Sequence, residues 1–162
     1  MKETIPAHIV SQRKPIHAAY VDFISAHGAD YFVGLAFNRE ITITGARRSF
    51  GKLLARIDSF YLGGKWAKFP SDERTLAFAV MEHVASNLHL HAVMKLPRGR
   101  TKRSVVTAET LIPAHWEKLV PSGSCDIKPI TYLRGAASYM TKEFNNPENW
   151  DHFIISTDFH NR

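Results

Sequence analysis

The alternation of hydrophobic and polar residues between positions 75 and 96 predicts two neighbouring β-strands. Residues 76–83 and 88–95 both alternate with a period of two, and a short turn at 85–87 would join them. One face of the second strand carries Leu88, Leu90, Ala92 and Met94. The other face carries His89, His91, Val93 and Lys95. The hairpin therefore offers one apolar face to a core and directs two histidines to the same side of the sheet.

Helical and strand periodicities also predict the other elements of the chain. Further strands are expected at 31–37, at 126–133 and in the tail near 152–156, and helices at 16–27, 44–62, 107–119 and 134–144. The helix at 44–62 has a regular apolar stripe formed by Phe50, Leu53, Leu54, Ile57, Phe60 and Tyr61. Pro129 marks the strand at 126–133 as an edge or irregular strand, because proline donates no ladder hydrogen bond.

This order of elements predicts an α+β fold of the β-α-β-β-α-β type, as in ferredoxin-like and RNA-recognition domains. Its strands would form an antiparallel sheet with helices packed on it. Residues 1–14 are expected to be a loose lead-in, and no internal repeat or linker divides the chain. We therefore expect a single domain over residues 1–162.

Composition and charge narrow the class of protein. The chain has 162 residues, 44% hydrophobic and 22% charged, which is typical of a soluble globular protein. It has neither an apolar run of about 18 residues that could span a membrane nor a secretory signal. A single cysteine, Cys125, forbids an internal disulfide and indicates the reducing cytoplasm. The net charge of +6 favours a polyanionic partner, most often nucleic acid.

The two histidines on one strand face are a candidate metal site. His89 and His91 are two residues apart, so their backbones are about 7 Å apart and their rings can share one ion. If Ser86 and Asn87 form the turn, Glu82 pairs directly with His91 and completes a His-His-Glu site. Such a histidine pair on a strand is also common at ordinary surfaces, and the nearby carboxylate favours the metal interpretation.

A tyrosine and a lysine share one face of the last predicted helix. Tyr139 could be a core residue beside Ala136 and Met140. It could instead be a nucleophile that attacks phosphorus. A phenol has a pKa of about 10, so a cation such as Lys142, three residues later, would have to favour the phenolate.

Two basic segments are candidate phosphate contacts. The first is the polar loop that follows the histidine strand, with Arg98, Arg100, Lys102 and Arg103. The second is the polar face of the helix at 44–62, with Arg48 and Lys52. Each could equally be a solvated surface. The segment 45–53 resembles a phosphate-binding loop, but its spacing is one residue too long and Leu53 replaces the required hydroxyl residue, so no nucleotide triphosphate site is expected.

These motifs together resemble the HUH endonucleases, in particular the rolling-circle replication initiators with one catalytic tyrosine. Residues 31–37 are similar to the apolar first motif, and His89-Leu90-His91 matches the His-hydrophobic-His motif. Residues 139–142 match the Tyr-x-x-Lys motif. The three motifs occur in the family's order and span residues 31–144. Gly34 and Ala36 stand where hydroxyl-bearing residues are common in the first motif.

The resemblance implies a specific chemistry. Members of the family bind single-stranded DNA, often beside a hairpin, and their tyrosine attacks a phosphodiester to give a 5′-phosphotyrosine linkage and a free 3′-hydroxyl. The reverse reaction rejoins strands. Carried over, Tyr139 is the nucleophile, Lys142 acts near the phosphate, and His89 and His91 hold Mn²⁺ or Mg²⁺. Imidazole ligands favour the transition metal.

The third ligand is assigned by hairpin geometry and not by a motif. Glu82 is our candidate, and His83 and Glu73 are alternatives. Tyr132 is interpreted as a structural residue on a strand, so the one-tyrosine type fits.

The predicted function is nicking and joining of single-stranded DNA, as in rolling-circle replication initiation. A single-strand transposase of the same chemistry is an alternative. A non-catalytic RNA-recognition-like domain is another, in which Tyr31, Phe37 and Phe78 could stack on bases, although core packing suits them better. No helicase domain is expected, so a host helicase is a candidate partner. No membrane partner is expected.

Overall fold

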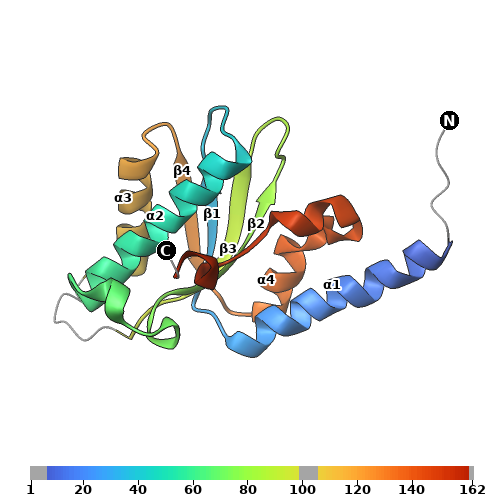
Figure 1. The fold of residues 1–162 in the computed structure, drawn as a ribbon, viewed down its shortest axis with the longest axis horizontal. Coiled ribbons are helices and arrows are strands. Elements are labelled where there is room, and N and C mark those ends of the chain that lie inside the picture. The colour runs from blue at the N-terminus through green and yellow to red at the C-terminus, as the bar shows by residue number, and fades with distance from the viewer. Residues whose placement is uncertain (1–6, 99–105, 161–162) are drawn as a thin grey trace.

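The computed structural model describes residues 7–98 and 106–160 and contains a five-stranded sheet with helices on both faces (Figure 1). The strands are β1 (Tyr31–Ala36), β2 (Leu76–Glu82), β3 (His89–Lys95), β4 (Ser124–Pro129) and β5 (Phe153–Ile155). The α-helices are α1 (Ala7–His27), α2 (Ile43–Leu62), α3 (Ala108–Leu119) and α4 (Leu133–Met140). In this part of the chain, no helix is long and apolar enough to cross a membrane.

The topology confirms the α+β prediction. The strand order is β4-β1-β3-β2-β5, and every neighbouring pair is antiparallel. The predicted β-α-β-β-α-β unit is β1-α2-β2-β3-α3-β4, and β5 extends the sheet beside β2. Pro129 ends the edge strand β4, where its missing N–H leaves no ladder bond unmade.

One face of the sheet packs against α2 and α3 to form the larger core. The core side chains include Leu90 and Ala92 of β3, Leu53 of α2 and Trp116 of α3, all fully buried. The α2 helix begins after Thr42, whose side-chain oxygen accepts a hydrogen bond from the Gly45 N–H at 3.0 Å. The predicted apolar stripe of this helix therefore contacts the predicted apolar face of the hairpin.

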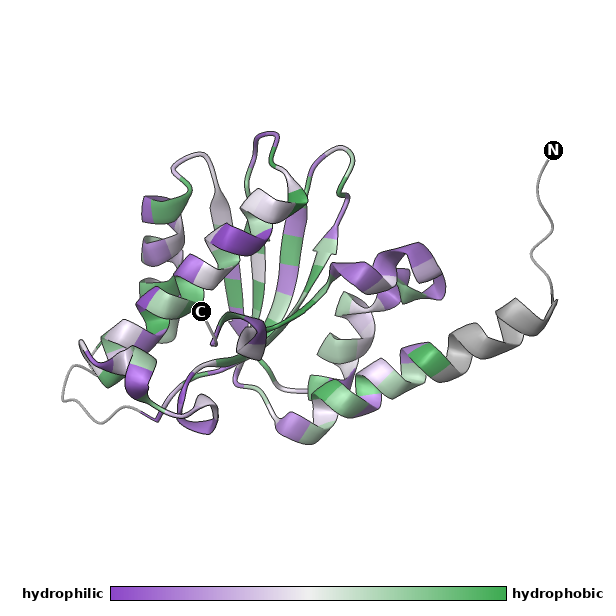
Figure 2. Ribbon diagram, viewed as in Figure 1, coloured by the Kyte–Doolittle hydropathy of each residue, from purple (hydrophilic) through white to green (hydrophobic). Residues whose placement is uncertain are grey.

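The opposite face is only partly covered, by α1, α4 and the segments that follow α4. Val21, Ile24, Phe78, Val93, Met140 and Phe144 form the buried cluster there. Figure 2 shows hydrophilic positions alternating with hydrophobic ones along β3. Val93 lies under the helical cover, whereas His89 and His91 stay half-buried on the same face. The uncovered part of this face is where the candidate site lies.

Three boundaries differ from the sequence prediction by more than two residues. The α1 helix begins at Ala7 and continues through Pro15, so the prediction of a loose lead-in is wrong for residues 7–14. Proline is most favourable in the first turn of a helix, whereas Pro15 lies inside α1. The predicted strand at 126–133 is β4, which ends at Pro129. Tyr132 therefore does not lie on a strand but at the N-cap of α4, with 69% of its surface exposed.

The predicted helix at 134–144 ends early. The α4 helix stops at Met140 and is followed by a 3₁₀ helix, Lys142–Asn145. At this junction the Thr141 hydroxyl donates to the Ala137 carbonyl at 2.7 Å, a local bond that competes with the helical ladder. Tyr139 lies in the last turn of α4, and Lys142 is the first residue of the 3₁₀ helix that follows.

Candidate active site

The hairpin of β2 and β3 places Glu82, His89 and His91 together on the uncovered face of the sheet. Glu82 is the last residue of β2, and the two histidines lie at the start of β3. The carboxylate is buried, with a side chain only 2% exposed, and contacts both rings. A buried carboxylate requires compensation by cations or hydrogen-bond donors, and the groups around Glu82 are where it can find them.

The strand register differs from the pairing proposed from the sequence. Glu82 lies opposite His89 and not opposite His91, which pairs with Val80. The reason is a longer turn. His83 adopts a left-handed backbone with φ of 52°, and its carbonyl accepts hydrogen bonds from the N–H groups of Ser86 and Asn87, each at 3.1 Å. The shift amounts to two residues, so all three side chains stay on the predicted face.

The two ring nitrogens of His89 have different partners. Its Nδ1 lies 3.1 Å from the Asn87 carbonyl oxygen, which can only accept, so Nδ1 carries the proton. Its Nε2 lies 3.1 Å from Glu82 Oε2. In a neutral ring this nitrogen presents a lone pair to a carboxylate oxygen. The lone pair and the carboxylate oxygen repel each other. A cation between the two atoms, either a proton or a metal ion, removes this repulsion.

The other half of the carboxylate faces His91. His91 Nδ1 lies 3.9 Å from Glu82 Oε1, and both atoms are buried without a hydrogen-bond partner among the described residues. Burial lowers the pKa of His91, and the Glu82 charge opposes this only in part. The imidazole is therefore neutral near pH 7, the form that ligates metals. Lys142 Nζ also lies 3.5 Å from Glu82 Oε1, so a cation shared with His91 Nδ1 would add to an ion pair that is already there.

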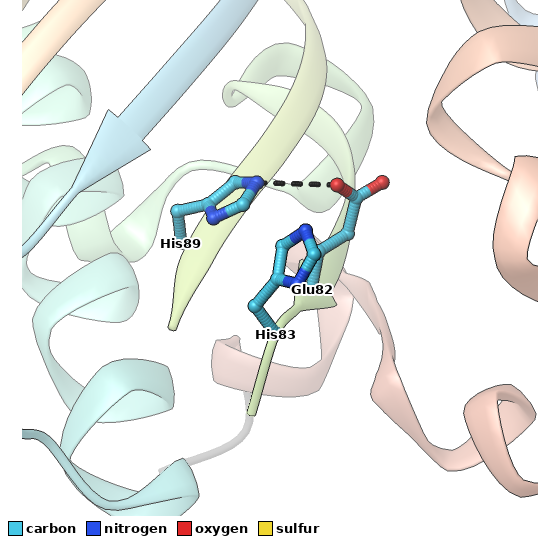
Figure 3. Close-up of side chains that lie close together, drawn as sticks. All are labelled: Glu82, His83 and His89. Atoms are coloured by element: carbon cyan, nitrogen blue, oxygen red, sulfur yellow. Dashed lines mark hydrogen bonds and ion pairs between the residues drawn. The ribbon is translucent and has the colours of Figure 1, made fainter. Parts of the chain in front are cut away.

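His83 joins this group from the turn. Ligand atoms of Glu82, His83 and His89 lie within 4.8 Å of one another. Figure 3 shows the His83 ring beside the Glu82 carboxylate, with a ring nitrogen directed toward the contact between His89 and Glu82. Strand alternation had placed His83 on the opposite face. Only the left-handed backbone, which the sequence pattern does not reveal, brings the ring to this side.

The remaining alternative ligand lies elsewhere. Glu73 belongs to a short helix, Ser71–Glu73, before β2, whereas Glu82 is at the far end of that strand. At about 3.3 Å per residue, the strand separates the two by about 20 Å, so Glu73 does not join the cluster.

Tyr139 lies over the histidines. Its ring stacks on His91 with a centroid distance of 5.5 Å and an interplanar angle of 12°. The residue is 52% exposed, so the core interpretation of Tyr139 is wrong, and Met140 and Ala137 fill the core instead. A stacked but exposed phenol can be reached by a substrate that lies on this face.

Lys142 connects the tyrosine to the carboxylate. Its Nζ lies 4.0 Å from the centre of the Tyr139 ring and 3.5 Å from Glu82 Oε1. Burial acts to lower the pKa of Lys142, but the Glu82 carboxylate and the Tyr139 phenol outweigh it, so the pKa is raised. The ammonium is therefore charged at neutral pH, and Lys142 cannot be a general base there.

A cleft of about 400 Å³ opens beside the tyrosine. It is lined by Phe32, Gly34, Ala36, His89, His91, Ser124, Asp126, Lys128 and Tyr139, among others. Gly34 and Ala36, the departures from the first motif, form its floor. A Cβ on Gly34 would meet no atom closer than 3.9 Å, so the absence of a side chain keeps the cleft open and is not required for packing.

Three of the six candidate phosphate contacts, Arg98, Arg48 and Lys52, belong to the described residues. Arg98 is exposed, and Arg100, Lys102 and Arg103 lie outside the described residues. Arg48 and Lys52 are exposed on α2, which packs on the other face of the sheet, so the structure does not bring them to Tyr139.

The aromatic residues proposed for base stacking are core residues. Phe37 and Phe78 are buried, and Tyr31 packs against the larger core. The alternative in which these rings stack on bases therefore has no support in the fold.

No protein-family model, curated protein or solved structure matches this chain. The donor set of the site is two or three imidazoles and one carboxylate. These groups fit a divalent ion such as Mn²⁺, and a carboxylate with open positions also accommodates Mg²⁺. The facing acceptors around Glu82 are the observation on which this fit rests.

Proposed function

We propose that this chain is a metal-dependent, site-specific endonuclease and strand transferase that acts on single-stranded DNA through Tyr139. The observation that carries the proposal is the position of the phenol. Tyr139 is half-exposed, stacks on His91 and contacts Lys142, so the nucleophile, the cation and the metal-ligand group lie on one open face.

The proposed reaction is a transesterification. The Tyr139 oxygen attacks a phosphorus atom of the DNA strand, a P–O bond to Tyr139 forms, and the P–O bond to the 3′-oxygen breaks. The phenol proton leaves to water, and the departing 3′-oxygen takes up a proton. The phosphodiester energy is retained in the 5′-phosphotyrosine bond, so the reverse attack by a 3′-hydroxyl rejoins strands without ATP.

Lys142 is suited to assist the nucleophile. Its charged ammonium lies over the Tyr139 ring, where it offsets the negative charge of an approaching phosphate. Its ion pair with Glu82 Oε1 fixes the ammonium between the tyrosine and the carboxylate. Lysine supplies charge here, and the proton acceptor must be another group.

Glu82, His89 and His91 would hold the ion. Bound there, Mn²⁺ or Mg²⁺ would polarise the scissile phosphate as a Lewis acid. The Asn87 carbonyl fixes the His89 tautomer that leaves Nε2 free. The adjacent cleft would take the DNA nucleotides that flank the scissile bond, because it is open and is lined by both histidines and Tyr139.

Initiation of rolling-circle replication in the cytoplasm is the proposed setting. The net charge of +6 suits a DNA strand, and the single cysteine suits a reducing compartment. A single-strand transposase would use the same site.

The proposal is tested by trapping the covalent adduct. The purified chain is incubated with Mn²⁺ and a labelled pool of single-stranded oligonucleotides, and an SDS-resistant protein–DNA band is expected. Tyr139→Phe and EDTA should each abolish the band, while Tyr139→Phe should still bind the oligonucleotide that the parent cleaves. Binding without any adduct, across pools that include hairpins, would instead identify a non-catalytic binding domain.

A further inference from the structure

Three imidazoles surround a single carboxylate at the end of the β2–β3 hairpin. Glu82 Oε2 faces His89 Nε2 at 3.1 Å, and Glu82 Oε1 faces His91 Nδ1 at 3.9 Å. The ring centroids of His83 and His89 are 5.1 Å apart, and those of His89 and His91 are 5.0 Å apart. The rings of His83 and His91 therefore lie at nearly equal distances from that of His89.

The backbone of His83 explains how a turn residue reaches the site. Its φ of 52° is in the left-handed region, which is unusual for a residue other than glycine. Non-glycine residues held in this conformation cluster at functional sites. Here the left-handed turn reverses the direction that strand alternation would give the side chain and brings the ring beside Glu82 (Figure 3).

We propose that His83 is a fourth protein ligand of the ion: Glu82, His83 and His89, whose ligand atoms already lie within 4.8 Å of one another, are joined by His91, which lies outside that group, when the ion binds. The inference rests on the metal site of the proposed function. Its consequence is selectivity. Imidazole nitrogen suits Mn²⁺, Co²⁺ and Zn²⁺, whereas Mg²⁺ prefers oxygen and retains its waters. A third imidazole therefore shifts the preference of the site toward transition metals.

The arrangement leaves the substrate side of the ion free. His83 and Glu82 line a second cleft, of about 350 Å³, together with Glu143, Asn149 and His152. The cleft beside Tyr139 is lined by His89 and His91 instead. A ligand from the His83 side would close the ion on the side away from the tyrosine, so the remaining coordination positions face the DNA.

Calorimetric titration of the full chain with Mn²⁺ and, separately, with Mg²⁺ tests the assignment without any DNA. His83→Gly removes the ring and suits the left-handed backbone, so it should fold. We expect this variant to bind Mn²⁺ about 10-fold more weakly or worse, and Mg²⁺ with nearly unchanged affinity. His83→Ala should repeat the result. His152→Ala, which alters the same cleft outside the ligand group, should leave Mn²⁺ binding at the parental level.

Pulsed electron paramagnetic resonance of bound Mn²⁺ counts the ligands directly. Three histidine nitrogens are expected in the parent and two in His83→Gly. The assignment would be overturned by an equal number of coordinated histidine nitrogens in the parent and His83→Gly, or by an unchanged Mn²⁺ affinity of His83→Gly. An equal loss of Mn²⁺ affinity in His152→Ala would also overturn it. If the protein nicks DNA but Mn²⁺ binding does not depend on His83, only the assignment of His83 as a ligand is refuted. If Mn²⁺ binding depends on His83 but no DNA is nicked, only the proposed reaction is refuted.

Discussion

Glu82 is the residue to which every other member of the site connects. Its carboxylate contacts His89 and Lys142 directly and lies 3.9 Å from His91. A buried, charged carboxylate costs several kcal/mol unless it is paired, so its neighbours must be cationic or must share a cation with it. The geometry of one side chain thus links the candidate ligands to the lysine beside the nucleophile.

Replacing Glu82 by Gln should weaken Mn²⁺ binding by about 10–100-fold, because the amide has the same shape but no charge to offer the ion. Calorimetric titration with Mn²⁺ measures the change. Glu143→Gln is the matched control, since Glu143 is an exposed carboxylate that lines the second cleft outside the ligand group. Parental affinity in Glu82→Gln would exclude Glu82 as a ligand.

The left-handed backbone of His83 has a measurable effect on stability. A Cβ in this region costs about 1–2 kcal/mol, which glycine avoids at the expense of a more flexible unfolded chain. In EDTA, His83→Gly should therefore be more stable than His83→Ala by about 1 kcal/mol. Urea unfolding of the two variants measures this difference, and an alanine variant at least as stable as the glycine variant would show that the turn is not strained.

At the scale of elements, the sequence predicted which segments form the site but not how two of them end. Period-two alternation placed Glu82, His89 and His91 on one face, and the three-residue spacing brought Tyr139 and Lys142 together. The register was missed because a left-handed residue lengthens the turn, and alternation cannot indicate it. The early end of α4 was missed because the chain continues as a 3₁₀ helix, Lys142–Asn145, and the same helical periodicity fits both helices.

The junction of β1, α3 and β4 tests the fold away from the site. A Cβ on Gly123 would lie 2.6 Å from the Ala36 carbonyl oxygen and 2.7 Å from Trp116 Nε1, atoms that are hydrogen-bonded to each other at 3.1 Å. Gly123→Ala should therefore destabilise the protein by about 2–4 kcal/mol, measured by urea unfolding.

Gly64→Ala is the matched control for this substitution, because no atom lies within 4 Å of a Cβ there. It should change the unfolding free energy by less than about 1 kcal/mol. Equal stability of the two variants would mean that the packing at Gly123 is looser than described.

At the scale of the molecule, the two faces of the sheet have different roles: one forms the larger core and the other carries the candidate site. The face under α2 and α3 is closed and forms the larger core, which contains the aromatic rings Phe37 and Trp116. The face under α1 and α4 is open at one end, and the candidate site occupies that end (Figure 1). Periodicity predicted the sheet and helices packed on it, but not that helices would cover both of its faces. The opening is a property of packing: α1 and α4 bury Phe78 and Val93, whereas His89 stays partly exposed and His91 lies under the exposed ring of Tyr139.

Buried histidines make the stability of the protein depend on pH. Burial lowers the pKa of His91, His115 and His160, and nearby Arg and Lys side chains add to the effect at His115. An unfolded histidine binds a proton near pH 6.5 while these folded ones do not. Their contribution to stability is therefore complete above pH 6.5 and is lost as the pH falls through their lowered values.

Urea unfolding in EDTA between pH 7.5 and 5 should accordingly give a free energy of unfolding that decreases toward low pH. In His115→Gln the decrease should be shallower, because one buried neutral imidazole is gone. A decrease of the same slope in the parent and the variant would show that His115 titrates normally in the folded protein.

The identity of the residue that becomes attached to DNA is the most direct test of the account. After reaction with Mn²⁺ and a cleavable single-stranded oligonucleotide, the adduct is digested with protease and nuclease and analysed by tandem mass spectrometry. The account predicts a 5′-phosphonucleotide on Tyr139 and a free 3′-hydroxyl on the released strand. A modification on Tyr132, the more exposed tyrosine nearby, or a hydrolysed strand without any modified tyrosine would contradict it.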